Sequence, residues 1–167
     1  MPHIHELYDF TSSAYIVFEN KVLLVHHKKL KTWIAPGGHI ELDEDPIQTL
    51  WREITEETGL KKPNLKLIKT SQNIPELENT NFFQELASPF AMFVVDYGIN
   101  SAHKHIDLCY LITSNTSKVT LEASSSYGID WFSVDNIELL HKKGLMFQNS
   151  YVYSKFAINY IKNNVLA

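Results

Sequence analysis

The 167-residue sequence contains one cysteine, one arginine and no long apolar run. The single cysteine, Cys109, excludes an internal disulfide, and the apolar residues around it predict a buried, inert thiol. The longest apolar runs, such as residues 90–95, are far shorter than the ~20 residues that cross a bilayer, which excludes a membrane-spanning helix. The first residues lack the basic segment followed by an apolar one that marks a targeting signal. We therefore expect a cytoplasmic protein without a membrane partner.

Positive charge is scarce as well. The chain has 15 lysine and arginine residues and 19 acidic ones, and the net charge of −4 argues against electrostatic capture by nucleic acid. Arg52 is the one arginine, so the chain lacks the guanidinium forks that base-reading and phosphate-reading proteins favour. Seven of the 19 acidic residues lie between positions 41 and 57. This segment is therefore the first candidate for a functional site.

The rest of the sequence predicts one domain, residues 1–167, because no repeat, low-complexity tract or linker divides it. Asn20 separates two β-rich runs and predicts a hairpin. Strands are expected at residues 13–18, 21–26, 33–35, 64–71, 90–96, 105–113, 118–122 and 129–132. Helices are expected at 46–58, from 135 to about 143, and in an amphipathic segment around 152–161. Strands and helices together predict a mixed β-sheet covered by helices.

The helix expected at 46–58 has clear start and stop signals. Asp45 is a favourable N-cap, Pro46 suits the first helical position, and Gln48 completes a pattern like a capping box. Gly59 can adopt the left-handed conformation that ends a helix. Apolar residues follow at helical spacing, so one face of this helix is expected to pack on the sheet.

Another face of the same helix presents three carboxylates: Glu53, Glu56 and Glu57. The last two fall in the final turn, where the helix dipole disfavours an acid by ~0.3–1 kcal/mol. A divalent cation would reverse this cost, because clustered oxygen ligands suit Mg²⁺ or Mn²⁺. The alternative interpretation is a solvated acidic face without a ligand.

The spacing of the acids decides between these interpretations. From Gly38 to Leu60 the sequence satisfies G-x5-E-x7-R-E-U-x-E-E-x-G-U, in which U is aliphatic. With each of the fixed residues taken at about one in twenty, a chance match is on the order of one in a billion per starting point. This pattern is the Nudix box, and the chain resembles the Nudix hydrolase family.

The resemblance implies an α/β fold of the α+β kind, an α/β/α sandwich with a mixed β-sheet. It also implies metal-dependent hydrolysis of a nucleoside diphosphate linked to another moiety, in which water attacks phosphorus. Glu53, Glu56 and Glu57 would ligate the metal, Arg52 would orient a ligating carboxylate, and Glu44 would hold the arginine. Gly38 would contribute its backbone to the metal site or the substrate loop, and His39 beside it would reach substrate phosphate.

The general base is less clear from the sequence. Glu122 is the nearest acid before the strand that contains Trp131, and its alternative interpretation is an exposed strand-end acid. In that case Glu53 would serve as the base, with the metal lowering the pKa of the water.

Other residues outside the box have two interpretations each. His103, His105 and Asp107 alternate, as do His3 and His5, which is compatible with a transition-metal site or with ordinary strand histidines. Three aromatic residues either stack a base or belong to the core and its rim: Phe82, Phe83 and Tyr97.

Two other functions compete with hydrolysis. A Nudix-type module could bind a nucleotide without cleaving it, but the full set of box carboxylates argues against that. A diphosphate isomerase of the same superfamily would use a cysteine, and Cys109 has no recognisable motif around it. We therefore expect a hydrolase that acts on a small nucleotide, and a homodimer is compatible with the sequence.

Overall fold

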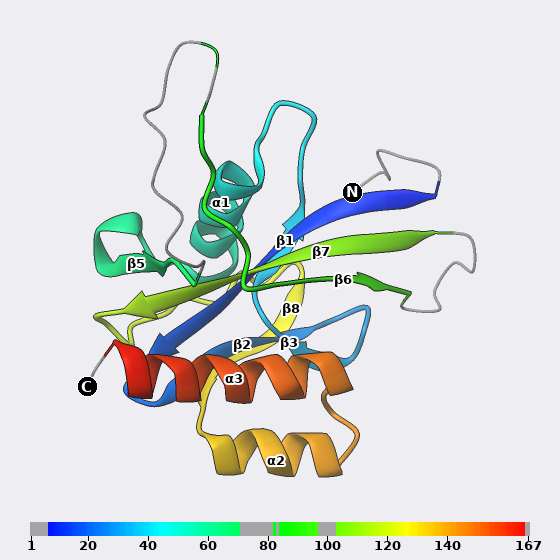
Figure 1. Ribbon diagram of the computed structural model, residues 1–167. Helices are drawn as coiled ribbons and strands as arrows, with labels where there is room; N and C mark the ends of the chain where they lie inside the picture. Colours follow the sequence, from blue (N-terminus) through cyan, green and yellow to red (C-terminus); the bar gives the residue numbers. More distant parts are fainter. Residues whose placement is uncertain (1–6, 71–81, 83, 97–102, 166–167) are drawn as a thin grey trace.

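The computed structural model describes residues 7–70, 82, 84–96 and 103–165, which form one mixed β-sheet with helices on both faces (Figure 1). The strands are β1 (Tyr8–Phe18), β2 (Lys21–His27), β3 (Thr32–Ile34), β4 (Gly37–His39), β5 (Leu65–Ile68), β6 (Ala91–Val95), β7 (Lys104–Ser114) and β8 (Ser126–Phe132). The helices are α1 (Pro46–Thr58), the short 3₁₀ helix η1 (Lys62–Asn64), α2 (Val134–Lys142) and α3 (Gln148–Asn164). The expected α/β/α sandwich with a mixed sheet is confirmed.

Strand β1 lies at the centre of the sheet. It pairs in parallel with β7 along most of its length, whereas the other pairings in the described residues are antiparallel. Its second edge is shared, because β4 pairs with Thr11–Ser13 and β2 pairs with the end of β1. Glu19 and Asn20 connect β1 and β2 with positive φ angles, which fits the tight hairpin that Asn20 predicted.

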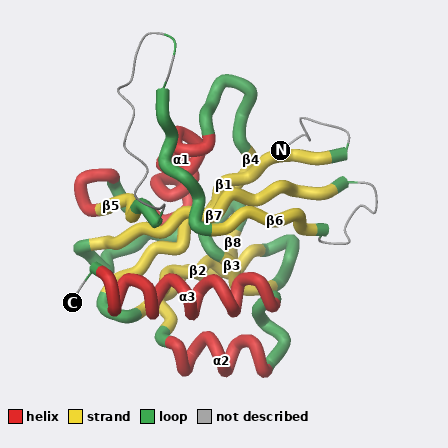
Figure 2. The backbone as a smooth tube through the Cα atoms, in the orientation of Figure 1, coloured by secondary structure: helices red, strands yellow, loops and turns green. Residues whose placement is uncertain are grey.

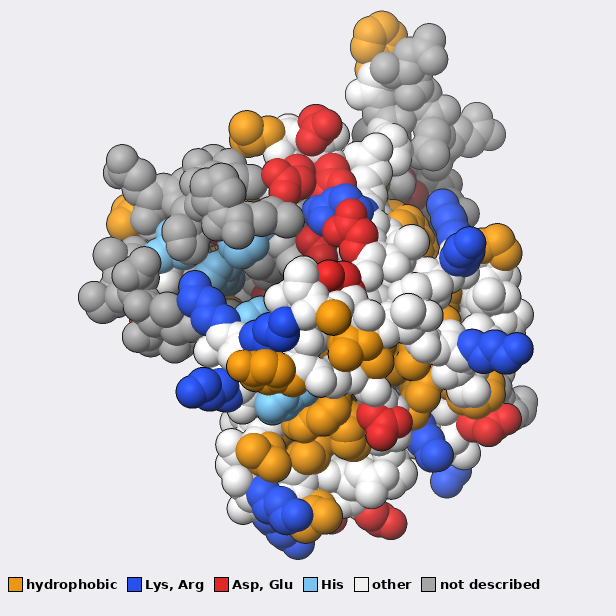
Figure 3. Space-filling view, turned by 180° about the vertical axis from the view of Figure 1, so that it is seen from behind, with side chains coloured by type: hydrophobic (Ala, Val, Ile, Leu, Met, Phe, Trp, Pro, Cys, Tyr) orange, Lys and Arg blue, Asp and Glu red, His pale blue; other side chains and the backbone are white. Residues whose placement is uncertain are grey.

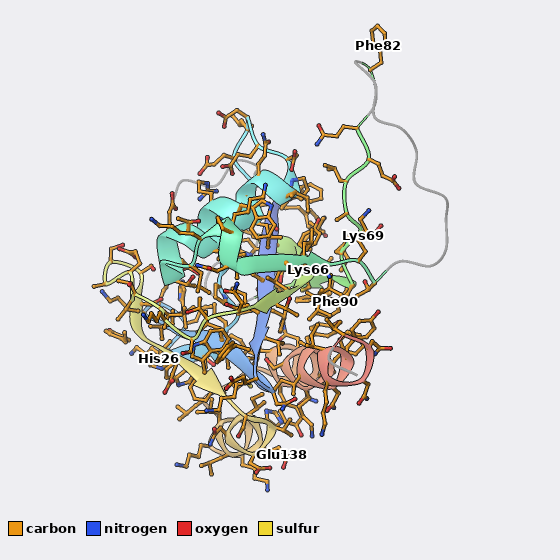
Figure 4. All side chains as sticks on the ribbon, turned by 90° about the vertical axis from the view of Figure 1, so that its left-hand side faces the viewer. His26, Lys66, Lys69, Phe82, Phe90 and Glu138 are labelled. Atoms are coloured by element: carbon orange, nitrogen blue, oxygen red, sulfur yellow. The ribbon has the colours of Figure 1, made fainter. Side chains whose placement is uncertain are left out.

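Two buried clusters lie on opposite faces of the sheet. Ala14 and Ile16 of β1 pack with residues of α1, whereas the alternate residues Tyr15 and Val17 pack with residues of α2 and α3. Figure 2 shows α1 on one side of the sheet and the other two helices on the opposite side. Phe90 lies between the sheet and α3 (Figure 4), and its ring stacks on that of Phe156 at 5.2 Å between centroids. The helix that contains the acidic box is therefore held apart from the other two.

The strand predicted at 118–122 is wrong. This segment is irregular, and its backbone donates to the end of α1 instead of to a strand. Thr120 N donates to Thr58 O at 2.8 Å, and Glu122 N lies 3.4 Å from Glu57 O. The last carbonyl groups of a helix receive no hydrogen bond from within the helix. The N–H groups of this segment supply that hydrogen bond.

Two further expectations change in the structure. Val152 and Phe156 lie in the segment predicted to be an amphipathic helix, but both side chains are exposed in α3. Ser150 and Ser154 lie on its buried face, because small side chains allow close packing. Phe82 is fully exposed and stands away from the sheet (Figure 4), so it is not part of the core. Residues Phe83, Tyr97, His3 and His5 lie outside the described residues. None of the described helices is long and apolar enough to cross a membrane.

Candidate metal and active site

Helix α1 begins and ends where its sequence signals predict. The Asp45 side chain accepts hydrogen bonds from Ile47 N and Gln48 N at 2.7 and 2.9 Å, and the Gln48 side chain accepts one from Asp45 N at 2.8 Å. Gly59 ends the helix with a φ of 69°. Both ends are therefore capped, which gives the carboxylates of this helix a rigid support.

The three predicted metal ligands differ in burial. Glu53 and Glu57 are 6% and 9% exposed, whereas the side chain of Glu56 is 56% exposed. The reason is that α1 packs on β4 as well as on β1, and the carboxylates of Glu53 and Glu57 face β4. The sequence alone places all three on one face, and the tertiary structure separates two inner acids from one outer acid.

Arg52 holds these acids together. Its Nε and Nη2 atoms donate to the two oxygens of Glu44 at 2.7 and 2.8 Å, in a bidentate arrangement. Its Nη1 atom donates to Glu53 at 2.7 Å and to Glu56 at 3.3 Å, and Nη2 also donates to His39 O at 3.1 Å. The predicted roles of Arg52 in orienting a carboxylate and of Glu44 in holding the arginine agree with this geometry.

The two glycines of β4 approach the inner carboxylates closely. A Cβ atom on Gly38 would overlap the carboxylate of Glu53, so a larger residue there would displace that carboxylate. Gly37 N donates to Glu57 Oε2 at 3.0 Å. Each inner acid therefore lies directly on the main chain of β4.

The electrostatics of the inner acids follow from their burial. Burial raises the pKa of Glu57 to about 7, against the opposing hydrogen bond from Gly37 N and with a further increase from neighbouring acids. Burial also raises the pKa of Glu53, although Arg52 opposes that change. The hydrogen bond from Arg52 lowers the pKa of Glu44 to about 2. Two carboxylates are thus held in a place where their negative charge is unfavourable.

This donor set fits a divalent cation. Glu53, Glu56 and Glu57 offer only oxygen atoms, which are the ligands that Mg²⁺ and Mn²⁺ prefer. A bound cation would compensate the buried charge of Glu57 and the part of the Glu53 charge that Arg52 does not offset. Figure 3 shows acidic side chains gathered around a basic one on this face of the molecule, with a group of histidine side chains beside them.

Glu122 lies beside this group, near the end of α1. Its carboxylate accepts hydrogen bonds from the backbone and hydroxyl groups of Ser124 and Ser125, at 2.7–3.0 Å. The Ser124 hydroxyl and the other donors lower the pKa of Glu122 to about 2. A carboxylate stabilised in its ionised form is a weak base, so these contacts favour Glu53 for proton transfer.

The alternating residues of β7 separate into two environments. Asp107 is buried and accepts hydrogen bonds from Thr11 and Ser13 of β1, at 2.8 Å from each hydroxyl. His105 instead lies against His39, with 3.1 Å between the two Nε2 atoms. His39 therefore turns its side chain towards β7 while its carbonyl oxygen contacts Arg52.

Sequence reasoning missed three residues at this site. Gly37 binds Glu57, the Thr49 hydroxyl donates to Glu44 at 2.7 Å, and Asp9 lies 3.5 Å from His39. Glu44 precedes α1 and lies five positions before Thr49, so this contact does not follow from the i,i+3 or i,i+4 spacing of a helix. Asp9 has no local signal either, because only the parallel pairing of β1 and β7 brings it to the histidines.

Known proteins are similar to this chain in sequence and in fold. The NUDIX domain model matches residues 9–155. The chain is 31% identical over 104 residues to a protein of Lactococcus lactis subsp. cremoris (strain MG1363) named "Probable DHNTP pyrophosphohydrolase", with 61% of this chain and 52% of that protein covered. It is 34% identical over 50 residues to an RNA pyrophosphohydrolase of Methylococcus capsulatus, with 30% of this chain and 26% of that protein covered. The matched part thus spans about half of the first relative and about a quarter of the second.

Solved structures agree over nearly the whole chain. A NUDIX-family hydrolase from Clostridium perfringens is 27% identical with a TM-score of 0.73, over 92% of this chain and 97% of that one. The dihydroneopterin triphosphate pyrophosphohydrolase of E. coli is 13% identical with a TM-score of 0.61, over 94% and 99%, and shows the fold alone. Because the family model spans most of the chain and the box between residues 38 and 60 is complete, the chain belongs to the Nudix family.

Proposed function

We propose that this protein is a metal-dependent hydrolase that cleaves a phosphoric anhydride bond in a small nucleotide, a nucleoside diphosphate linked to another moiety. The observation that carries the proposal is the pair of buried carboxylates, Glu53 and Glu57, which lie on the main chain of β4 beside an arginine. Folding alone would not favour two buried acids in the last turns of a helix. A bound cation would make the two buried negative charges favourable, and the cation would in turn bind a phosphate substrate.

The residues divide the work of the reaction. Glu53, Glu56 and Glu57 would hold Mg²⁺ or Mn²⁺, which supplies positive charge for the diphosphate oxygens and lowers the pKa of a water molecule. The water oxygen would bond to phosphorus, the bridging oxygen would leave with the other phosphate group as the P–O bond breaks, and Glu53 would accept the proton of the water. Gly38 and the main chain of His39 would form the substrate loop, and Arg52 keeps Glu53 in place. Glu122 would contribute negative charge beside Glu57.

The proposed substrate is small. The one arginine of the chain is engaged with three glutamates and the His39 carbonyl, so it is already committed within the site. The net charge of −4 gives no electrostatic attraction for a long polyanion. The name of the Lactococcus relative, "Probable DHNTP pyrophosphohydrolase", supports a pyrophosphohydrolase reaction. The RNA pyrophosphohydrolase of Methylococcus capsulatus matches a much shorter part of the chain.

The structure also bears on the isomerase alternative. Cys109 is the one cysteine, and it is completely buried on the face of the sheet that α3 covers. Burial raises the pKa of its thiol, and the nearby Asp107 carboxylate raises it further. A thiol in this position is inert and out of reach of a substrate at the box. This observation favours hydrolysis over isomerisation.

A product assay tests the proposal. The protein with Mg²⁺ or Mn²⁺ would be given nucleoside triphosphates, nucleoside diphosphate sugars, a dinucleoside polyphosphate and 5′-triphosphorylated RNA, and phosphate, pyrophosphate and nucleoside monophosphate would be measured. We expect turnover of at least one small nucleotide, lost in Glu57→Gln and kept in Asp135→Asn, which removes an exposed acid of α2. Binding without turnover would support the binding module, a rearranged diphosphate would support the isomerase, and preference for RNA would refute the small substrate.

A further inference from the structure

A second group of potential metal ligands lies beside the Nudix site, on the opposite face of β4. Asp9 of β1, His39 of β4 and His105 of β7 place one donor atom each within 4.8 Å of one another. Asp9 is buried, and the two histidines are half-buried, so the group is enclosed by protein but open enough to admit an ion. We define these three residues as the Asp9 cluster.

The register of the sheet assembles this cluster. Asp9 and His105 are direct partners in the parallel pairing of β1 with β7, and His39 pairs with Thr11, two residues further along β1. Paired residues in a sheet share a face, and so do residues two apart on one strand. All three side chains therefore project from the same face. Gly38, the neighbour of His39, faces the Glu53 carboxylate on the other side.

The distances match a single bound ion. The Nε2 atoms of His39 and His105 are 3.1 Å apart, and His39 Nε2 is 3.5 Å from Asp9 Oδ2. Zinc binds imidazole nitrogen and carboxylate oxygen at about 2.0–2.2 Å, which makes the edge of a tetrahedral ligand set roughly 3.3 Å. Both of these distances lie close to that value, and the third pair of donor atoms, on Asp9 and His105, lies within 4.8 Å. One ion could contact all three donors once the side chains close that third distance.

A fourth residue supports the carboxylate. His103 Nε2 lies 3.0 Å from Asp9 Oδ2, and both groups are buried. In metal sites a neighbouring polar group commonly orients a ligating side chain. His103, which directly precedes β7, is placed to do this for Asp9, since its Nε2 atom contacts the carboxylate. The cluster therefore has its own supporting contact in addition to its three donors.

We propose that the Asp9 cluster binds one divalent transition-metal ion of the zinc type, separately from the Mg²⁺ or Mn²⁺ expected at the carboxylates. Two imidazoles and one carboxylate suit Zn²⁺, whereas Mg²⁺ prefers oxygen ligands and octahedral geometry. Three protein ligands leave a position of a four-coordinate ion open. Because His39 also contacts Arg52 through its carbonyl oxygen, the ion would hold β4 at the edge of the Nudix site.

Co²⁺ is the probe for this site, because a tetrahedral Co²⁺ site absorbs visible light much more strongly than an octahedral site of oxygen ligands. Untagged protein would be titrated with Co²⁺ and the complex then displaced with Zn²⁺. We expect one strongly absorbing Co²⁺ per chain in the wild type. The double variant Glu56→Gln/Glu57→Gln should keep this signal, because it changes only the carboxylate site.

Variants of the cluster provide the decisive comparison. Asp9→Asn and His105→Gln keep the size of the side chains, and each should weaken Co²⁺ binding by at least about tenfold. One control should bind like the wild type: His141→Ala on α2. The proposal fails if the wild type gives no strong visible absorption, if the carboxylate double variant removes it, or if both cluster variants bind Co²⁺ normally. The wild-type spectrum alone can overturn the proposal if a variant does not fold.

Discussion

Replacing Glu57 with glutamine should stabilise the metal-free protein above neutral pH. Burial raises the pKa of Glu57 from its ordinary value of 4.5 to about 7. The folded state therefore binds this proton more tightly than the unfolded state does. The stability that protonated Glu57 contributes is present in full below pH 4.5 and is lost as the pH rises to about 7. Above that pH the folded protein carries a buried, uncompensated charge.

The size of the effect follows from the two pKa values. The difference between 4.5 and about 7 corresponds to about 3 kcal/mol in the free energy of unfolding, at about 1.4 kcal/mol per pKa unit. Glutamine carries no charge, and its oxygen can still accept the hydrogen bond from Gly37 N. At pH 8.5, Glu57→Gln should therefore be more stable than the wild type by up to about 3 kcal/mol. At pH 4.5 the two proteins should differ little.

Glu56→Gln is the matched control. It removes the same charge from the neighbouring position, but the Glu56 side chain is 56% exposed and water screens it. We expect a change of less than about 0.5 kcal/mol at either pH. The assay is urea unfolding with a metal chelator at pH 4.5 and pH 8.5. A gain of 3 kcal/mol would appear as a rise of about 6–12 °C in melting temperature for a domain of this size.

Mg²⁺ should reverse the order of stability. A cation that binds only the folded state stabilises it by mass action, so Mg²⁺ should raise the melting temperature of the wild type. Both variants should lose this rise together with hydrolase activity. The reasoning is refuted if Glu57→Gln destabilises the metal-free protein equally at both pH values, or if Glu56→Gln gives the same gain at pH 8.5. It is also refuted if the wild type shows no response to Mg²⁺ while the variants remain fully active.

Four further variants test the general base, the contact between β4 and Glu53, and the buried thiol. Glu53→Gln should lower kcat by about 10²–10⁴, which is the usual contribution of a general base. Glu122→Gln should lower kcat by less than about threefold, because that carboxylate is a weak base. The reverse pattern in steady-state kinetics would make Glu122 the base. Gly38→Ala should displace the Glu53 carboxylate and reduce kcat at least tenfold, and full activity would show that the close approach is unimportant. Cys109→Ala should keep kcat within about twofold, since the thiol is buried on the face of the sheet that α3 covers. It should lower the free energy of unfolding in chemical denaturation by on the order of 1 kcal/mol. Loss of turnover in the folded variant would support the isomerase hypothesis.

Much of the Nudix helix and part of the sheet could be predicted from the sequence. The cap at Asp45, the cap at Gly59 and the hairpin at Asn20 each involve residues only a few positions apart in the chain. Local patterns were therefore sufficient to predict them. The strand predicted at 118–122 is wrong, because these residues have the pattern of a strand but their backbone donates to the end of α1. Nothing in a local pattern shows which distant carbonyl groups a segment will contact.

The family, the helix that holds the box and the three carboxylates on one side of it follow from the sequence alone, because each depends on spacing along a regular helix. The burial of Glu57 against Gly37 and the exposure of Glu56 to water follow only from the tertiary structure. The same is true of the Asp9 cluster, whose residues come from three separate strands. Burial and donor geometry depend on how strands far apart in the chain pair and pack, and the spacing of residues in one segment does not specify that pairing.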